Sequence, residues 1–227
     1  MRILFEDNHV LVAVKPPMVP TQADASGDAD MLSMVREYLR ETYHKPGNVY
    51  VGLLHRLDRP VGGVMVFAKT SKAASRLSRQ IREGGMQKEY LAVVHGLPPA
   101  EGRMEDFLLK DGTKNRVKVV REGAPGAKWA ALSFRREAAR RDRSLVRVFL
   151  ETGRPHQIRV QFASRGYPLL GDMRYGRGEG GGIALYSAGI GFTHPVSGER
   201  LFFASRPRGG FFREFLENAP ETESLFL

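Results

Sequence analysis

The sequence predicts an α+β fold in which a mixed, largely antiparallel sheet is flanked by helices. Segments of strand length and apolar character recur along the 227 residues, and turns that contain Gly, Pro or Asp separate them. Segments with apolar residues at helical spacing are fewer. Because most predicted strands follow one another through short turns, antiparallel hairpins are favoured over alternating strand–helix units. We find no internal repeat and no long linker, and we expect a single catalytic domain over residues 1–227.

The first third of the chain is predicted to contain strands at 10–14 and 64–68 and helices at 31–43 and 71–83. The first strand ends at Lys15-Pro16-Pro17, because a strand interior does not accept prolines. The second helix begins at Thr70-Ser71 and stops at Gly84-Gly85, which are residues typical of helix ends.

The rest of the chain is predicted to be mostly strands, at 88–96, 104–109, 117–120, 128–135, 144–151 and 183–192. Pro155 is expected in the first turn of a helix, where its missing N–H costs nothing. A short helix is expected at 211–216, and a tail from about residue 219 is expected to be frayed.

The composition indicates a basic protein without cysteine. Lys and Arg number 35 against 25 Asp and Glu, which gives a net charge of +10. This excess favours a polyanionic partner such as nucleic acid, although a lineage with Arg-rich proteins would produce it too. The lack of cysteine excludes disulfides and thiolate metal sites and fits a reducing compartment. No apolar run approaches the roughly 20 residues of a membrane span, and early acids argue against a signal peptide, so we expect a cytoplasmic protein without membrane contact.

The densest group of functional side chains is His55-Arg56-Leu57-Asp58-Arg59-Pro60, which precedes Gly62-Gly63 and the second predicted strand. A polar loop that leads into a buried strand can hold a carboxylate rigidly at the floor of a cleft. The two glycines suggest a tight backbone path or the close approach of another segment. An ordinary charged turn is the alternative interpretation of this segment.

Further motifs follow in order along the chain. They are Lys88-Glu89-Tyr90-Leu91-Ala92-Val93-Val94-His95-Gly96, Thr152-Gly153-Arg154-Pro155-His156-Gln157-Ile158-Arg159 and Pro168-Leu169-Leu170-Gly171-Asp172-Met173-Arg174-Tyr175-Gly176. Together with the segment around Asp58, they resemble the signatures of the RluA-type pseudouridine synthases, enzymes that isomerise uridine within RNA. The resemblance extends from about Leu11 to about Glu199. The chain departs from the family at Val61-Gly62, where Thr-Ser is common.

The resemblance implies an isomerase that needs no cofactor and no metal. It implies that Asp58 is the catalytic residue, that Tyr90 stacks on the target uracil and that Arg159 keeps the carboxylate charged. The carboxylate must be ionised whether it attacks the sugar as a nucleophile or removes a proton from C2′. Because burial raises the pKa of a carboxyl group, a neighbouring arginine is a suitable partner. We assign His55 a packing role and no role in proton transfer.

Other residues are expected to contribute to RNA binding and base flipping. By the same resemblance, Arg56 fills the space left by an extruded base. Arg154 is the alternative cation beside the catalytic carboxylate, or a contact to RNA phosphate. His156 and Gln157 are expected to orient the site, and Leu185 is expected to pack against the uracil.

Several questions stay open at the level of sequence. The basic run 135–143 is favoured as a solvated hairpin tip, with a patch that contacts RNA phosphates as the alternative. We expect a monomer that acts on structured RNA, either large-subunit ribosomal RNA, tRNA or both. We do not expect the S4 RNA-binding domain of many family members within these 227 residues. The alternative functions are a non-catalytic RNA-binding or RNA-folding module on the same fold, and a glycosidase-like hydrolase. Intact Asp58, Tyr90 and Arg159 argue against the first, and the lack of a second acid in the motifs argues against the second.

Overall fold

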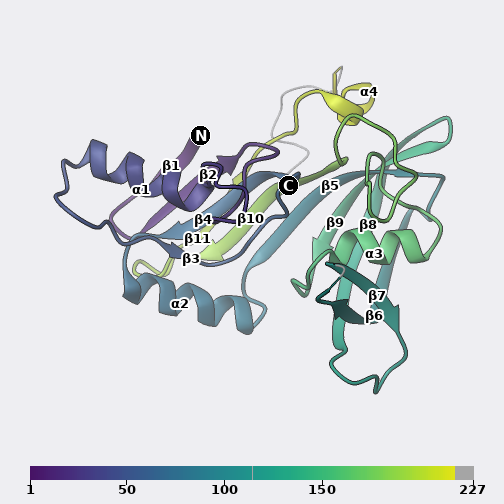
Figure 1. Ribbon diagram of the computed structural model, residues 1–227, viewed down its shortest axis with the longest axis horizontal. Coiled ribbons are helices and arrows are strands. Elements are labelled where there is room, and N and C mark those ends of the chain that lie inside the picture. The colour runs from purple at the N-terminus through teal and green to yellow at the C-terminus, as the bar shows by residue number, and fades with distance from the viewer. Residues whose placement is uncertain (114, 218–227) are drawn as a thin grey trace. The chain divides into compact units, whose positions relative to one another are not determined.

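The computed structural model describes residues 1–113 and 115–217 of the chain (Figure 1). The tail predicted to be frayed from about residue 219 lies outside the described residues. The predicted α+β class is confirmed, because the strands form mostly antiparallel pairs and are accompanied by few helices. The chain divides into two compact units, the first made of Met1–Gln87 with Ser187–Arg206, and the second of Lys88–Tyr186 with the residues from Pro207. The single catalytic domain over 1–227 stays a prediction.

The sheet of the first unit is built from segments near both ends of the chain. Its strands are β1 (Arg2–Glu6), β2 (Val10–Lys15), β3 (Gly52–Leu53), β4 (Gly62–Ala68), β10 (Leu185–Thr193) and β11 (Arg200–Ala204). They follow the order β1-β2-β4-β10, with β3 paired to β4 and β11 paired to β10. The first two residues of β10 belong to the second unit. The predicted strands 10–14 and 64–68 are therefore confirmed as the centre of this sheet.

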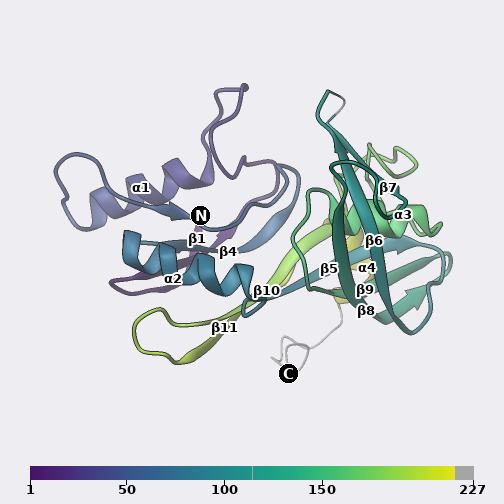
Figure 2. The same cartoon turned by 90° about the horizontal axis from the view of Figure 1, so that it is seen from below.

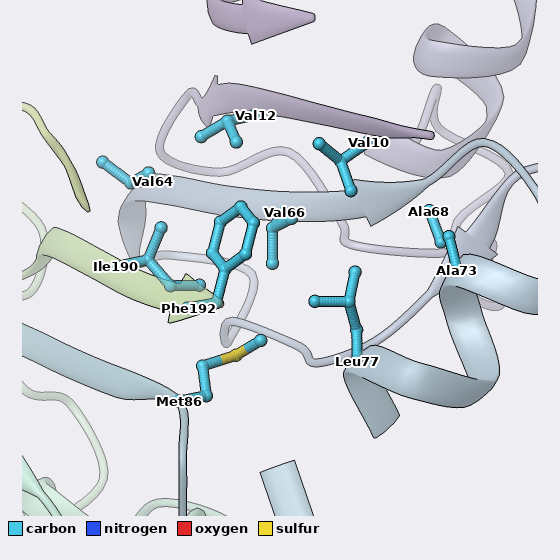
Figure 3. Close-up of a cluster of buried hydrophobic side chains, with 10 residues drawn as sticks. All are labelled: Val10, Val12, Val64, Val66, Ala68, Ala73, Leu77, Met86, Ile190 and Phe192. Atoms are coloured by element: carbon cyan, nitrogen blue, oxygen red, sulfur yellow. The ribbon is translucent and has the colours of Figure 1, made fainter. Parts of the chain in front are cut away.

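The core of the first unit lies between this sheet and a helix. Side chains from β2, β4 and β10 point toward Ala73 and Leu77 of α2 (Ser71–Arg82), as Figure 3 shows. Leu11 and Phe67, which alternate to the other face of their strands, are also fully buried. Burial on both faces explains why these strands read as continuous apolar runs.

Two edge strands were not predicted from the sequence. β1 and β11 are short, and more of their side chains are partly or fully exposed than in β2 or β4. Strand formation at such an edge depends on pairing with a neighbour more than on local propensity. β1 pairs with β2 in antiparallel register, and β11 pairs likewise with β10.

Both predicted helices of the first unit form, and a side chain caps the start of each. Asp30 begins α1 (Met31–Thr42), because its side chain accepts a hydrogen bond from the Ser33 N–H at 3.1 Å. Thr70 caps α2 in the same way, through the Ala73 N–H at 3.1 Å. Such caps satisfy backbone donors that have no partner in the first turn.

Gly63 marks the close approach of two strands, as its sequence position suggested. Its φ is +127°, and a Cβ at this position would stand 2.2 Å from the Ser187 carbonyl oxygen of β10. No other residue fits this position without movement of the backbone. The conformation of Gly63 thus brings the end of the motif segment against β10.

The second unit is a meander of long antiparallel strands. Its strands are β5 (Gln87–His95), β6 (Glu101–Asp111), β7 (Arg116–Val120), β8 (Lys128–Arg140) and β9 (Arg143–Leu150), in the order β5-β9-β8-β6-β7. Each neighbouring pair is antiparallel. Helix α3 (Gln157–Ser164) packs against β6 and β7 (Figures 1 and 2). A 3-10 turn at Gly210–Phe212 and α4 (Arg213–Leu216) form the short predicted C-terminal helix.

Two local features of the second unit refine the sequence prediction. The basic run 135–143 lies in a hairpin, as predicted, but β8 extends through Arg140 before the turn at Arg141, whose φ is +55°. Pro155 lies outside the helix, and its predicted place in the first turn is wrong. The N-cap of α3 is His156, whose φ of +52° breaks the helical path between Pro155 and Gln157.

Within the described ranges, no helix combines the length and the apolar character that crossing a membrane requires. In the same part of the chain, no three His, Cys, Asp or Glu side chains are grouped so that they could hold a metal ion.

Candidate active site

In the first unit, hydrogen bonds fix the backbone on both sides of Asp58. The Thr21 hydroxyl donates to the Leu57 carbonyl at 2.8 Å and accepts the Leu57 N–H at 3.2 Å. The Lys15 ammonium donates to the Arg59 carbonyl at 2.9 Å. Because the residues before and after Asp58 are both tied to distant segments, the path of the motif loop is set by tertiary contacts.

Lys15 is a fully buried cation beneath this loop. Its side chain is 0% exposed, and its Nζ also donates to the carbonyls of Pro16, at 3.1 Å, and Val19. Three carbonyl acceptors match the three N–H groups of an ammonium. Burial lowers the pKa of Lys15 to about 8, although the nearby Asp58 carboxylate acts in the opposite direction. The sequence reading placed Lys15 at the strand end and assigned it no function.

In the loop 55–60, Asp58 and Arg56 differ in their exposure to solvent. Asp58 is half-buried, and its carbonyl accepts the Val61 N–H at 2.9 Å, which closes a turn before β4. Arg56 is exposed, which suits a side chain expected to enter RNA. Arg59 donates to the Ser26 hydroxyl at 2.9 Å and forms ion pairs with Asp24 and Asp28, so it holds the preceding loop against the motif.

His55 has a structural contact of the kind expected for a packing residue. Its Nε2 accepts a hydrogen bond from the Val66 N–H of β4 at 3.2 Å. A ring nitrogen engaged as an acceptor from the backbone is occupied, which agrees with a role in orienting the loop. The absence of a role in proton transfer stays a prediction.

In the second unit, Gln157 organises the loop that carries Arg154. Its Oε1 accepts the Arg154 N–H at 3.0 Å and the Thr152 hydroxyl at 2.8 Å. Its Nε2 donates to the Ala131 carbonyl of β8 at 3.0 Å. Gln157, the first residue of α3, therefore ties the loop to the sheet, and its orienting role stays a prediction.

Arg159 is buried in the first turns of α3 and binds a buried carboxylate. Only 7% of Arg159 and 1% of Asp172 are exposed. Nε and Nη2 of Arg159 donate to the two carboxylate oxygens of Asp172 at 2.7 and 2.8 Å, a bidentate geometry. Burial alone would raise the pKa of Asp172, but the Arg159 guanidinium and the N–H groups of Arg174 and Tyr175 outweigh it and lower the pKa.

Tyr175 completes the surroundings of Arg159. The guanidinium carbon of Arg159 lies 5.2 Å from the centre of the Tyr175 ring, within cation–π range. The Tyr175 hydroxyl lies 2.9 Å from His156 Nδ1 and accepts the Val117 N–H at 2.7 Å. His156 therefore contacts this cluster, and its orienting role stays a prediction. Asp172 and Tyr175 were recognised as part of a motif but were given no role, and their spacing after Gly171 was the available signal.

Tyr90 and Leu185 lie on strands rather than on the loop. Tyr90 is 7% exposed and pairs with Val148 of β9. Leu185 is buried at the start of β10, and the carbonyl of the preceding Ala184 accepts the Val93 N–H of β5 at 3.0 Å. Both side chains therefore belong to rigid elements of the second unit, which suits residues that contact a base.

The predicted site residues fall into two groups. Arg56 and Asp58 lie in the first unit, and the other predicted site residues, Tyr90, Arg154, His156, Gln157, Arg159 and Leu185, lie in the second. The second unit joins Arg154 to Gln157, and it joins His156 and Arg159 through Tyr175. The predicted pairing of Arg159 with Asp58 stays a prediction.

Comparison with known proteins places these motifs in one family. The family model described as RNA pseudouridylate synthase matches residues 9–164. The chain is 33% identical over 215 residues to ribosomal large subunit pseudouridine synthase C of Buchnera aphidicola subsp. Acyrthosiphon pisum (strain APS), covering 88% of this chain and 65% of that protein. It is 32% identical over 217 residues to ribosomal large subunit pseudouridine synthase D of Zymomonas mobilis subsp. mobilis, covering 89% of this chain and 68% of that protein.

A third relative and a solved structure agree. Ribosomal large subunit pseudouridine synthase C of Escherichia coli (strain K12) is 36% identical over 209 residues, covering 87% of this chain and 63% of that protein. The chain thus spans about two thirds of the length of these relatives. The solved structure of Human RNA Pseudouridylate Synthase Domain Containing 4 has the same fold, with a TM-score of 0.76 and 20% identity over 91% of this chain and 89% of that one. The order of the motifs, the hydrogen-bonded loop around Asp58 and these matches agree with one another. The chain therefore belongs to the RluA-type RNA pseudouridylate synthase family.

Proposed function

We propose that the protein is an RNA pseudouridine synthase that isomerises uridine in structured RNA, with Asp58 as the catalytic residue. The observation that carries the proposal is the position of Asp58 in its motif, half-buried and with both neighbouring residues held by Thr21 and Lys15. A rigid carboxylate is what a reaction at the ribose requires. The names of the relatives support large-subunit ribosomal RNA as the substrate, with tRNA as the alternative.

The reaction needs only rearrangement of one nucleotide. The bond between N1 and C1′ breaks, the uracil turns, and C5 bonds to C1′. C5 then loses its proton, and N1 gains one. Asp58 either attacks C1′ as a nucleophile, in a bond that breaks when C5 bonds to C1′, or removes the C2′ proton and returns it when the C5–C1′ bond forms. Either role requires the ionised carboxylate. Arg159 is assigned as the cation that favours the ionised form of Asp58 during this reaction.

The remaining site residues bind and present the nucleotide. A uridine in a stem or loop must leave its stack to be modified, and Arg56 occupies the space that it leaves. Tyr90 stacks on the extruded uracil, a contact worth about 1–3 kcal/mol. Leu185 packs against the base, while His156 and Gln157 hold the arginine-bearing segment in place.

Mapping of pseudouridine in cells tests the proposal directly. RNA from cells that lack the protein is treated with a carbodiimide and compared with RNA from wild-type cells. A missing pseudouridine should be restored by the wild-type gene and not by Asp58→Asn. The variant must match the wild type in melting temperature and in RNA binding, so that only turnover has changed. Restoration by Asp58→Asn would overturn the assignment, and no missing pseudouridine in any RNA would favour the non-catalytic RNA-binding module.

The role of Arg159 has a separate test. At a temperature at which thermal melting shows Arg159→Ala to be folded, the variant should lose turnover with a modest loss of RNA binding, because the cation is required at the reacting carboxylate. Arg165→Ala is the matched control, since Arg165 follows α3 and forms a more exposed ion pair with Asp106. A large loss of binding with a normal single-turnover rate would place Arg159 on RNA phosphate instead.

The proposal includes a monomer that acts in the cytoplasm. The lack of cysteine fits a reducing compartment. Light scattering on the purified protein, free and with RNA, measures the oligomeric state, and cell fractionation measures the location. A stable dimer, or recovery with membranes, would contradict this part of the proposal.

A further inference from the structure

Lys88 and Arg154 are two cations placed together in the second unit without a carboxylate. Lys88 begins this unit on β5, and its Nζ lies 3.4 Å from the position that a Cβ would take at Gly153. Arg154 is the next residue of that loop. Burial and the charge of Arg154 together lower the pKa of Lys88. No carboxylate among residues 1–113 and 115–217 forms an ion pair with either side chain, so their mutual repulsion is not compensated within the described protein.

The loop holds Arg154 in this position. Arg154 Nε donates to the Trp129 carbonyl at 2.9 Å, and its backbone N–H donates to Gln157 Oε1 at 3.0 Å. The contact through Nε fixes the guanidinium, whose Nη groups carry further N–H donors for an anion. A fixed guanidinium beside a partly buried ammonium is unfavourable in the free protein and becomes favourable when an anion binds.

Lys88 also lies close to the residue expected to stack on the base. Lys88 and Tyr90 are two positions apart on β5, so their side chains point to the same face, with roughly 6–7 Å between their Cα atoms. This spacing is comparable with the distance from a base to the phosphates of its own nucleotide. Glu89, between them, points to the other face and pairs with Arg147.

We propose that Lys88 and Arg154 form a binding site for one phosphate of the RNA backbone, next to the nucleotide that stacks on Tyr90. The proposal rests on the function proposed above and assigns this pair a positioning contact rather than a role in base recognition. A phosphate oxygen accepts from the ammonium and from the guanidinium at once, which compensates both charges. Lys88 has no other assigned function. The proposal assigns Arg154 to a phosphate of the RNA and not to the catalytic carboxylate.

Inorganic phosphate provides the first test, independent of turnover. Lysines labelled with ¹³C are followed by NMR as the pH is raised, and Lys88→Gln assigns the Lys88 signal. In the free protein, the pKa of Lys88 should lie below that of a lysine in water. Phosphate should raise the pKa of Lys88 by roughly one unit, since an adjacent opposite charge favours the charged form, and should leave Lys118 unchanged. Sodium chloride at equal ionic strength is the control for screening.

The outcome of that titration decides the site. Arg154→Gln should raise the pKa of Lys88 in the free protein and weaken the response to phosphate, because one of the two cations has been removed. Equal shifts of Lys88 and Lys118, or no shift of Lys88 at saturating phosphate, would overturn the proposal.

Turnover on the RNA found by pseudouridine mapping is the second test. Lys88→Gln and Arg154→Gln should each raise KM about 10-fold to 100-fold, as expected for one charge-assisted contact, with kcat within about threefold of the wild type. In each variant the slope of log KM against log salt concentration should be smaller by about one, because one phosphate contact has been lost. Lys118→Gln, the matched control on the exposed strand β7, should change neither constant.

The two proposals fail in different ways. A fall in kcat at unchanged KM would show that the pair acts on the chemistry and not on the backbone. A wild-type protein that modifies no RNA would overturn the proposed function, while the phosphate titration would still decide whether the site exists.

Discussion

Lys15 is a buried side chain that holds the backbone next to Asp58 within the first unit. It has no exposed surface, and it donates to three carbonyls, one of which belongs to Arg59, the residue after Asp58. A charge placed so deeply is tolerated because each N–H has an acceptor and the Asp58 carboxylate lies close enough to act on its pKa. Lys15 thus connects the end of the buried strand β2 to the backbone next to Asp58.

Replacement of Lys15 by methionine should therefore lower stability and activity together. Lys15→Met keeps the length of the side chain but leaves three carbonyls without a donor, so the free energy of unfolding should fall by about 2–4 kcal/mol. Urea denaturation measures the loss, and Lys118→Met, a change at an exposed lysine, should stay within about 0.5 kcal/mol of the wild type. Wild-type stability in Lys15→Met would show that these contacts contribute little.

The low pKa of Lys15 also predicts how stability depends on pH. The folded value of about 8 lies below 10.5, the value expected when the lysine is in water. Between these values the unfolded chain binds more protons than the folded one, so stability contributed at Lys15 rises with pH. From pH 8 to 10.5 the wild type should gain roughly 3 kcal/mol relative to Lys15→Met. Urea curves at both ends of this window measure it, and parallel behaviour of the two proteins would contradict it.

Asp172 has the corresponding role at Arg159. Its pKa is held below 3.8, because the Arg159 guanidinium and two backbone N–H groups outweigh the effect of burial. The stability that it contributes is thus complete above pH 3.8 and is lost as the pH falls through the lowered value.

Asp172→Asn should be strongly destabilising at neutral pH. It leaves a buried guanidinium without its carboxylate, at a cost of about 3–5 kcal/mol. Thermal melts at pH 7 should show a large drop, whereas Asp142→Asn, which alters an ion pair on an exposed turn, should melt close to the wild type. The loss should shrink as the pH falls below 3.8 toward the lowered pKa of Asp172, because the unfolded wild type then binds a proton that the folded protein does not. A pH-independent difference would assign the effect to packing alone.

At the scale of elements, the position of β4 against β10 depends on one glycine. Gly63 has a positive φ, and the Ser187 carbonyl occupies the space of a side chain. Gly84 at the end of α2 also has a positive φ, of +74°, but has no atom within 4 Å of a Cβ. The two positions therefore separate backbone strain from steric overlap.

Gly63→Ala should destabilise the protein far more than Gly84→Ala. The first change combines strain with a clash against backbone and should cost about 2–5 kcal/mol. The second introduces strain alone, at about 1–2 kcal/mol. Chemical denaturation of the two variants measures the difference, and equal losses would show that β10 moves away from Gly63 without cost.

Elements were predictable where their signal is local. The apolar spacing of α1 and α2 and the cap at Thr70 lie within a few residues, so both helices were predicted. The edge strands β1 and β11 were missed because pairing with a neighbour makes them strands. Pro155 was misplaced because the left-handed His156 delays the helix by two residues.

At the scale of the whole molecule, the net charge of +10 predicts how RNA binding responds to salt. If the charge serves RNA, cations that neutralise phosphates release counterions on binding. Affinity for the mapped RNA should then fall at least about tenfold between 50 and 200 mM salt. Fluorescence anisotropy measures it, and an affinity independent of salt would favour the alternative that the charge reflects an Arg-rich lineage alone.

The sequence by itself determined the α+β class, the family, and the motif that contains Asp58, because those depend on residue type and spacing along a short stretch of chain. Only the tertiary structure decided that Lys15 would be buried under Arg59, 44 residues away, and that Asp172 would bind Arg159 across 13 residues. The physical reason is that burial and hydrogen-bond partners are properties of the neighbours in space. Folding alone brings those neighbours together from distant parts of the chain.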